Sequence, residues 1–307
     1  MSIGRLFHVL HAADELDPLD AFYDRLFAPW HGMMERHHSE RERRMGSILV
    51  IADAAVETAA PSADPGAQDA PIGRFVAKFG RHWHSLAWYC DDVGEVWERL
   101  TAAGVRVFEP GAVPAASRPA EGDIYTHPKD TATQLEFYQP PASHGGPQGS
   151  GPFPDPRFGD DWPARWAQTG DPLGVERLAW VTLVVGDLDR AVAVFCDGVG
   201  GRVVHEAESA VARTRGVFVA VGPSTVVELA TPLRPGSLAG RDLAAFGDTL
   251  HAVAFTVADL DRVSAHLGAL GIGVAARDDT TILADPADTF GAAFRFTTGR
   301  VPGDPRD

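Results

Sequence analysis

The side chains with the most chemical potential in this chain are histidines and carboxylates. The sequence has 12 histidines and 42 acidic residues but only two cysteines, Cys90 and Cys196, both within apolar segments. Two such cysteines form neither a disulfide framework nor a thiolate metal cluster. An imidazole grouped with carboxylates suits a borderline or hard divalent ion, or acid–base catalysis. Which of these chemistries is possible therefore depends on the strands and helices that position the histidines.

Several other functions are disfavoured by the sequence. It contains no phosphate loop, no dinucleotide fingerprint after a strand and no nucleophile elbow. The net charge of -15 disfavours a nucleic-acid binder, because such proteins carry a basic surface. The apolar runs are shorter than a membrane span, and the first residues lack the long apolar run of a secretory signal. We therefore expect a cytoplasmic protein with a small-molecule partner, no nucleic-acid or membrane partner, and a homodimer as an open alternative.

One strand-and-helix pattern occurs four times and indicates a repeat architecture. Each copy is an apolar strand that ends in an acidic residue and runs into an amphipathic helix, followed by about three short strands. Asp92, Asp187 and Asp259 lie where a helix N-cap carboxylate is expected. The copies begin at His8, Ser85, Trp180 and Ala252, and the expected helices cover residues 18–27, 93–103, 188–199 and 260–270.

Two stretches have the composition of connecting segments. Residues 59–73 are rich in Ala, Pro, Asp and Gly, and residues 140–172 are rich in Pro and Gly. Trp162 and Trp166 predict that the second stretch packs on a surface. We expect a first domain at residues 1–140, a linker at 141–175 and a second domain at 176–300, each domain with its own core.

A strand–helix–three-strand unit repeated in pairs resembles the vicinal oxygen chelate superfamily, which includes glyoxalase I, extradiol dioxygenases and methylmalonyl-CoA epimerase. The resemblance covers nearly the whole chain outside the two linkers. It implies an α+β fold of four βαβββ modules that form two tandem domains, each with a curved mixed sheet around a funnel. The first domain is similar to the epimerase in PIGRFVAKFG at 71–80, leading into WHSLAW at 83–88, and in HPKD at 127–130, leading into LEF at 135–137.

In that superfamily the metal ligands come from the first and last strands of each module. Strand alternation transfers these positions to this chain. The first-strand positions are His8, Ser85, Trp180 and Ala252, and the last-strand positions are Glu57, Glu136, Glu228 and Arg295.

The resemblance thus implies a divalent ion (Zn, Mn, Co, Ni or Mg) at His8, Glu57 and Glu136, with Ser85 in place of the family's second histidine. His84 would join these ligands only if a one-residue bulge turned it inward. Glu57 or Glu136 would be the catalytic base. The expected substrate contacts are Ser85, Trp88, Tyr89, Gln134 and Tyr138.

The second domain has lost the expected ligands. Trp180 and Ala252 cannot bind a metal, and Arg295 places a cation where a carboxylate is expected. A charge-assisted pair of Glu228 and Arg295 could fill that space. We expect a metal-free structural partner or a ligand-binding lobe, and the altered positions disfavour an extradiol dioxygenase.

Three functions stay open at this point, and whether the protein is an enzyme is undecided. The first is a divalent-metal-dependent isomerase, epimerase or lyase for a small oxygenated or acyl substrate in the first-domain funnel. The second is a metal-free protein that binds or sequesters a small apolar or aromatic ligand. The third is a metal-free enzyme that uses Glu136 and His8 as an acid–base pair. Alternatively, His8 is a hydrogen-bonded interior histidine and the two glutamates are solvated.

Overall fold

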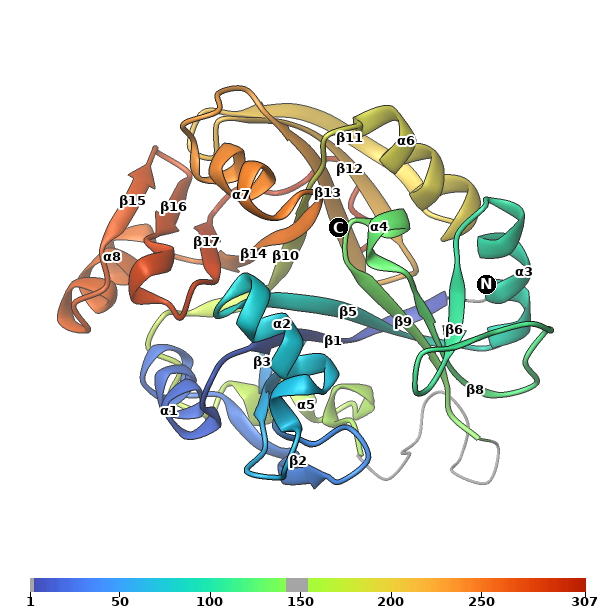
Figure 1. The fold of residues 1–307 in the computed structure, drawn as a ribbon. Coiled ribbons are helices and arrows are strands. Elements are labelled where there is room, and N and C mark those ends of the chain that lie inside the picture. The colour runs from blue at the N-terminus through green and yellow to red at the C-terminus, as the bar shows by residue number, and fades with distance from the viewer. Residues whose placement is uncertain (1–2, 142–153) are drawn as a thin grey trace.

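The strands form two mixed sheets, one from each half of the chain (Figure 1). The structure is a computed structural model that describes residues 3–141 and 154–307. The first sheet has the order β2-β3-β4-β1-β5-β9-β8-β6-β7. Its strands are β1 (Ile3–Ala12), β2 (Trp30–Ser39), β3 (Arg44–Ile51), β4 (Ala54–Pro61), β5 (His82–Cys90), β6 (Val107–Glu109), β7 (Val113–Pro114), β8 (Gly122–Thr126) and β9 (Gln134–Gln139).

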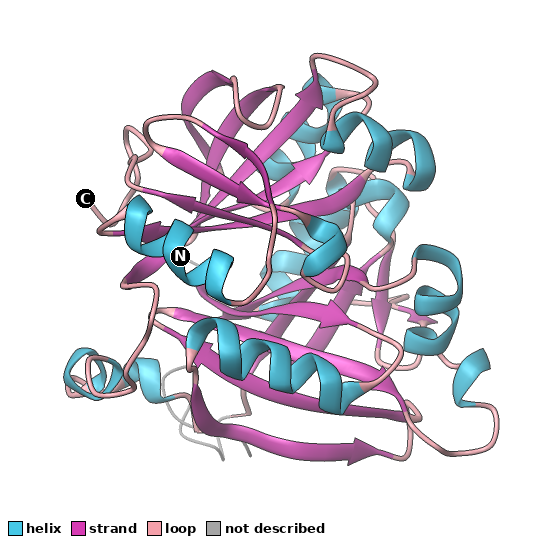
Figure 2. Cartoon of the chain, turned by 90° about the vertical axis from the view of Figure 1, so that its left-hand side faces the viewer, coloured by secondary structure: helices cyan, strands magenta, loops and turns pink. Residues whose placement is uncertain are grey.

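The second sheet repeats this arrangement in the order β11-β12-β13-β10-β14-β17-β16-β15. The strands of the two halves lie in separate layers (Figure 2). Four strand–helix–strand modules, paired into two mixed sheets, confirm the expected α+β fold. The strands of this sheet are β10 (Val175–Val184), β11 (Arg202–Ser209), β12 (Thr214–Val221), β13 (Thr225–Pro232), β14 (Thr249–Val257), β15 (Val274–Arg277), β16 (Thr281–Ala284) and β17 (Ala293–Thr297).

The two sheets also share one pairing register. In the first sheet, Ala87 of β5 pairs with His8 of β1 and with Glu136 of β9. In the second sheet, Ala254 of β14 pairs with Trp180 of β10 and with Arg295 of β17. Trp180 therefore occupies the position of His8, and Arg295 the position of Glu136, as the repeat predicted.

The helices that follow the four repeat strands are present as expected. The side chains of Asp92, Asp187 and Asp259 each accept a hydrogen bond from a first-turn backbone amide, which confirms the predicted N-caps. The third of these helices ends in a π-helical turn at Val194–Gly198. The helices are α1 (Leu16–Phe27), α2 (Pro71–Phe79), α3 (Val93–Ala102), α4 (Pro128–Thr131), α5 (Trp162–Trp166), α6 (Leu188–Ala193), α7 (Leu238–Phe246) and α8 (Leu260–Ala269).

The expected loop at 59–73 is shorter than its composition indicated. Strand β4 continues to Pro61, and α2 begins at Pro71. Proline is well suited to the first position of a helix, because the backbone amide at that position has no hydrogen-bond partner within the helix. In the described parts of the chain, no helix is long and apolar enough to cross a membrane.

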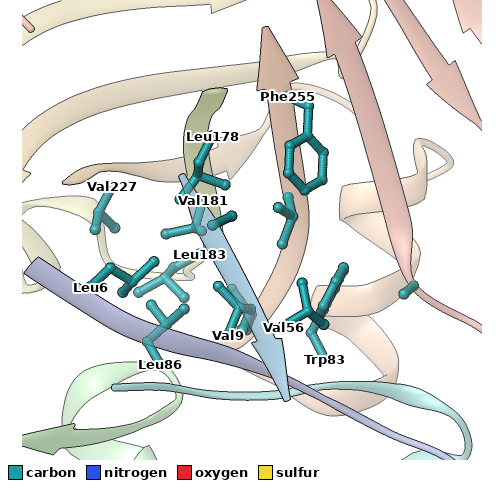
Figure 3. Packing of buried hydrophobic residues seen from close by; sticks show 14 of the residues in the cluster. Leu6, Val9, Val56, Trp83, Leu86, Leu178, Val181, Leu183, Val227 and Phe255 are labelled. Atoms are coloured by element: carbon teal, nitrogen blue, oxygen red, sulfur yellow. The ribbon is translucent and has the colours of Figure 1, made fainter. Parts of the chain in front are cut away.

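The main hydrophobic core is shared between the two halves. Leu6 and Leu86 of the first sheet pack in one cluster with Val181 and Leu183 of the second (Figure 3). Phe27 of α1 belongs to the same cluster. The expectation of a separate core in each domain is therefore wrong: each sheet uses its neighbour to remove its apolar face from water.

Strand alternation, together with a register shift between Leu6 and His8, turns other side chains to the outer face of the first sheet. Phe7, Ala87 and Tyr89 form a second cluster there with Trp162, from the segment that follows residue 153. Trp162 Nε1 donates to the Ala52 carbonyl at 2.7 Å. The prediction that this segment packs on a surface is confirmed, whereas residues 142–153 of the expected linker lie outside the described residues.

Candidate functional site

Four strands bring one row of side chains together on the outer face of the first sheet. His8, Ala87, Glu136 and Tyr125 are successive register partners on β1, β5, β9 and β8. Directly paired residues point to the same side of a sheet. Strand β4 adds Glu57 beside this row, because it pairs with β1 in parallel.

An imidazole and two carboxylates meet in this row. The Nε2 atom of His8 lies 3.0 Å from Oε2 of Glu57 and 3.9 Å from Oε2 of Glu136. Despite this proximity, the geometry gives neither ring nitrogen of His8 a hydrogen-bond partner. His8 is 4% exposed and Glu57 3%, whereas the Glu136 side chain is 16% exposed. Glu136 is therefore the member of the cluster that a ligand from solvent meets first.

Arg44 is a member of this site that the sequence analysis missed. It lies at the end of a charged run at residues 35–44, a composition typical of a solvated strand or loop. Its Nη1 donates to Oε1 of Glu57. Burial opposes the charge of this guanidinium, but Glu57 and Glu42 outweigh burial and raise the pKa of Arg44. One oxygen of Glu57 is thus held by a permanent cation.

The two carboxyl groups differ in protonation because their neighbours differ. Burial disfavours ionisation of Glu57, but Arg44 and His8 outweigh burial and hold its pKa below the usual value. Burial raises the pKa of Glu136 well above its usual value, and the charges of Asp123 and Glu57 add to this effect. Burial also lowers the pKa of His8 to about 4. These shifts favour the ionised form of Glu57, the protonated form of Glu136 and the neutral form of His8.

Two further groups on β8 surround Glu136. Burial raises the pKa of Asp123 to about 6. Burial and the nearby Glu136 carboxyl raise the pKa of Tyr125. Tyr125 pairs with Glu136 and Asp123 pairs with Tyr138, so strand alternation relative to Glu136 is the signal that could have found them.

His84 is the extra residue of a bulge. Leu10 pairs with Ser85, but the next residue of β1, His11, pairs with Trp83. Burial, followed by the charge of Arg44, lowers the pKa of His84 to about 4, and Glu57 and His8 also act on this ring. The bulge that the sequence left open is therefore present, next to the site. Nδ1 of His84 is buried without a partner. A role as a metal ligand stays a prediction.

The expected substrate contacts separate into two groups. Ser85 and Gln134 are register partners two positions from Glu136 and share its face. Tyr138 is on that face as well, with its ring 5.9 Å from Phe7.

The other two aromatic residues of β5 serve the fold. Tyr89 shares the outer face, but its hydroxyl donates to Asp155 at 3.3 Å, so it anchors the covering segment. Trp88 lies on the opposite face, fully buried in the shared core, and its Nε1 donates to Thr225 of the second half at 3.3 Å. The expectation that Trp88 contacts a substrate is therefore corrected, because Tyr89 and Trp88 are adjacent and strand alternation separates them.

The donors at this site match a divalent ion in chemical type. His8 is neutral, buried and unpartnered, and it faces oxygens of Glu57 and Glu136. Across residues 3–141 and 154–307, no three or more His, Cys, Asp or Glu side chains are already grouped as a metal centre. An ion would have to draw Glu136 closer to His8.

The equivalent positions of the second half hold an ion pair. Arg295 Nη1 donates to Oε2 of Glu228 at 2.7 Å, and both side chains are buried. The same oxygen accepts from Thr182 at 2.6 Å and from Trp180 at 3.1 Å. The charge-assisted pair expected from the sequence is thus present.

The comparisons with known proteins agree with this architecture. Residues 180–287 match the Glyoxalase/Bleomycin resistance protein/Dioxygenase superfamily. No curated protein matches the chain. A mutant of 4-hydroxymandelate synthase from Streptomyces coelicolor has a TM-score of 0.65 and 16% identity, and the match covers 100% of this chain and 98% of that chain. Methylmalonyl-CoA epimerase from Mycobacterium tuberculosis has a TM-score of 0.38 and 26% identity, with 41% of this chain and 89% of that chain covered.

Two sheets of paired modules, together with a whole-chain structural match, show a fold of the vicinal oxygen chelate type. The family match itself lies in the second half of the chain, over residues 180–287.

Proposed function

We propose that the outer face of the first sheet catalyses proton transfer at a carbon atom, as an isomerase, epimerase or lyase of a small oxygenated or acyl substrate. The observation that carries this proposal is the opposite displacement of two carboxyl pKa values around one histidine nitrogen. Titratable pairs whose environments push their pKa values apart are the usual acid and base of an active site.

The protonation states give each group a role. Glu57 is ionised and is the base that removes a proton next to a substrate carbonyl. Glu136, whose raised pKa favours the protonated form, is the acid that returns a proton. His8 is neutral and lies within 3.0 Å of one carboxyl oxygen and 3.9 Å of the other, so it can pass a proton between them.

A divalent metal is part of the proposal. His8, Glu57 and Glu136 are the residues that would hold it, and Arg44 competes for one oxygen of Glu57. When bound, such an ion polarises a carbonyl and stabilises the negative charge left by proton removal. The support for the metal is the fold of the whole chain and the buried imidazole without a partner.

Calorimetric titration with Zn²⁺, Mn²⁺, Co²⁺, Ni²⁺ and Mg²⁺ tests the metal site. We expect one ion per chain, at least tenfold weaker binding in His8→Ala and Glu136→Gln, and tighter binding in Arg44→Met because a competing cation is removed. Arg25→Met, which removes an exposed cation of α1, is the matched control and should leave the affinity unchanged. Equal affinity in the native protein and in both ligand variants would contradict the assignment of these residues.

Deuterium incorporation tests the chemistry separately. The protein is incubated in D2O with a panel of acyl-CoA thioesters and 2-oxo acids, with and without metal, and exchange at the α-carbon is followed by NMR. We expect exchange with at least one compound, and a loss of about 100-fold in Glu57→Gln, because general acid–base catalysis contributes about 10²–10⁴-fold. An absence of exchange across the panel in both conditions contradicts the proposed reaction.

A metal-free binding protein is the second candidate, and one observation favours it. Phe7 lies 4.6 Å from Tyr89 and 5.9 Å from Tyr138 between ring centroids, which gives the outer face an aromatic surface. Binding of a small aromatic ligand that is unchanged in His8→Ala and Glu136→Gln, without any exchange chemistry, would support this function over catalysis.

A further inference from the structure

Arg295 of β17 is a buried cation whose hydrogen-bonding capacity is only partly used. The residue is 2% exposed, and its Nη1 donates to Glu228. Its Nε and Nη2 atoms are also buried and have no partner. Buried polar groups are nearly always paired, so two free donors on one guanidinium need an explanation.

The free donors lie on the edge of the guanidinium that recognises paired oxygens. Nε and Nη2 form a planar fork whose spacing matches the two oxygens of a carboxylate. Glu228 cannot supply these oxygens, because its Oε2 already accepts from Arg295 Nη1, Trp180 and Thr182. The unpaired edge therefore consists of two buried donors without an acceptor among the described residues.

The pairing register adds a hydroxyl donor and an aromatic wall to the same face. Thr214 pairs with Pro232, just as Arg44 pairs with Pro61, so Thr214 takes the position from which Arg44 reaches Glu57 in the first sheet. Its Oγ1 is buried without a partner. Phe218, which pairs with Glu228, lies edge-on to Trp180 at 5.7 Å between ring centroids.

We propose that the outer face of the second sheet binds a small aromatic carboxylate without a metal, with the oxygens held by the free edge of Arg295. The aromatic body would lie against Trp180 and Phe218, and Thr214 would donate a further hydrogen bond. Glu228 lies on the opposite edge of the guanidinium, so the attraction of a carboxylate to Arg295 acts over a shorter distance than its repulsion by Glu228. This site is independent of the proton-transfer function proposed for the first sheet.

The test follows the Arg295 Nε–H resonance by ¹H–¹⁵N NMR while acetate, benzoate or phenylacetate is added, with benzamide as the uncharged control. We expect a saturable shift with benzoate or phenylacetate, weaker binding of acetate, and at least tenfold weaker binding of benzamide. Calorimetry on the same samples should give one site per chain. No shift with any of the three carboxylates up to millimolar concentration overturns the proposal.

Variants separate recognition from folding. Arg295→Lys keeps the charge but loses the fork, and we expect benzoate affinity to fall at least tenfold. The double change Arg295→Met with Glu228→Gln removes both charges, avoids a buried unpaired ion and should abolish binding. Thermal unfolding checks that each variant is folded. Unchanged benzoate affinity in a folded Arg295→Lys protein also overturns the proposal.

One competing location for an anion needs its own control. A cleft of about 450 Å³ is lined by Arg99 and Arg190, together with Asp130 and Asp197. Arg190→Met removes its exposed cation. Benzoate binding should be unchanged in this variant, and a loss there instead of in Arg295→Lys would move the site to the cleft and contradict the proposal.

Discussion

Glu136 of the first sheet and Arg295 of the second sheet occupy equivalent positions. Both side chains are ionisable and largely buried, but their neighbours differ. Arg295 forms an ion pair with Glu228, whose Oε2 lies 2.7 Å from its Nη1. Burial and the charges of Asp123 and Glu57 raise the pKa of Glu136, which favours its protonated form. A single side chain in an equivalent backbone position therefore decides whether the face contains an ion pair or an acid.

Glu136→Gln should stabilise the metal-free protein as the pH rises. Folding raises the pKa of Glu136 above its ordinary value of 4.5, so its stabilising effect is complete below that pH and is lost as the pH rises through the folded pKa. Glutamine cannot ionise and escapes this loss. We expect equal Tm values near pH 4 and a Tm about 2–4 °C higher for the variant at pH 8, measured by calorimetry in a chelator.

Glu109→Gln is the matched control, because Glu109 is an exposed glutamate of the same sheet. Its Tm difference from the native protein should not change between the two pH values. A Glu136→Gln variant whose Tm difference is equally independent of pH would contradict the raised pKa.

At the scale of elements, the sequence predicted the features that depend on strand alternation and on helix capping. We could predict the repeat strands, their helices and three aspartate caps. The signal is local: an acidic residue before an amphipathic run accepts hydrogen bonds from the free amides of the first helical turn. The bulge at His84 was not predictable, because it is a mismatch between β5 and β1 and no local pattern reports it. Arg44 was missed for the same reason: only the pairing of β3 with β4 brings it to Glu57.

Helix α1 links the two halves through aromatic contacts. Phe27 is 0% exposed, and its ring lies 5.2 Å from Phe255 and 5.6 Å from Phe294, both in the second sheet. Phe27→Ala should lower the free energy of unfolding by about 3–5 kcal/mol, because it removes a large buried ring and leaves a cavity. Urea denaturation followed by tryptophan fluorescence measures this change.

The neighbouring Arg25→Ala is the control for that measurement. Arg25 is exposed on the same helix, and surface changes of this kind stay within about 0.5 kcal/mol. A loss for Phe27→Ala as small as the loss for Arg25→Ala would show that α1 does not connect the halves.

At the scale of the whole molecule, one core serves two repeats. We propose the division into residues 1–140, 141–175 and 176–300 as a division into structural repeats and their connecting segment. The sequence could indicate which strand faces are apolar, but not that the two sheets cover each other, because periodicity does not identify the partner of a face. The shared core therefore appears only in the assembled structure.

The halves should not fold when separated. Residues 1–140 and 141–307, produced individually, would each expose the apolar face that the other covers, and such faces lead to aggregation. We expect low solubility of both halves and a single calorimetric transition for the intact chain. Two independent transitions, or a half that is monomeric and folded by NMR, would contradict this view.

The matching register has an evolutionary consequence. Because Trp180 and Arg295 stand where His8 and Glu136 stand, Trp180→His and Arg295→Glu would give the second sheet the same imidazole and two glutamates as the first. The duplicated scaffold thus lies only two substitutions away from a second copy of the same constellation.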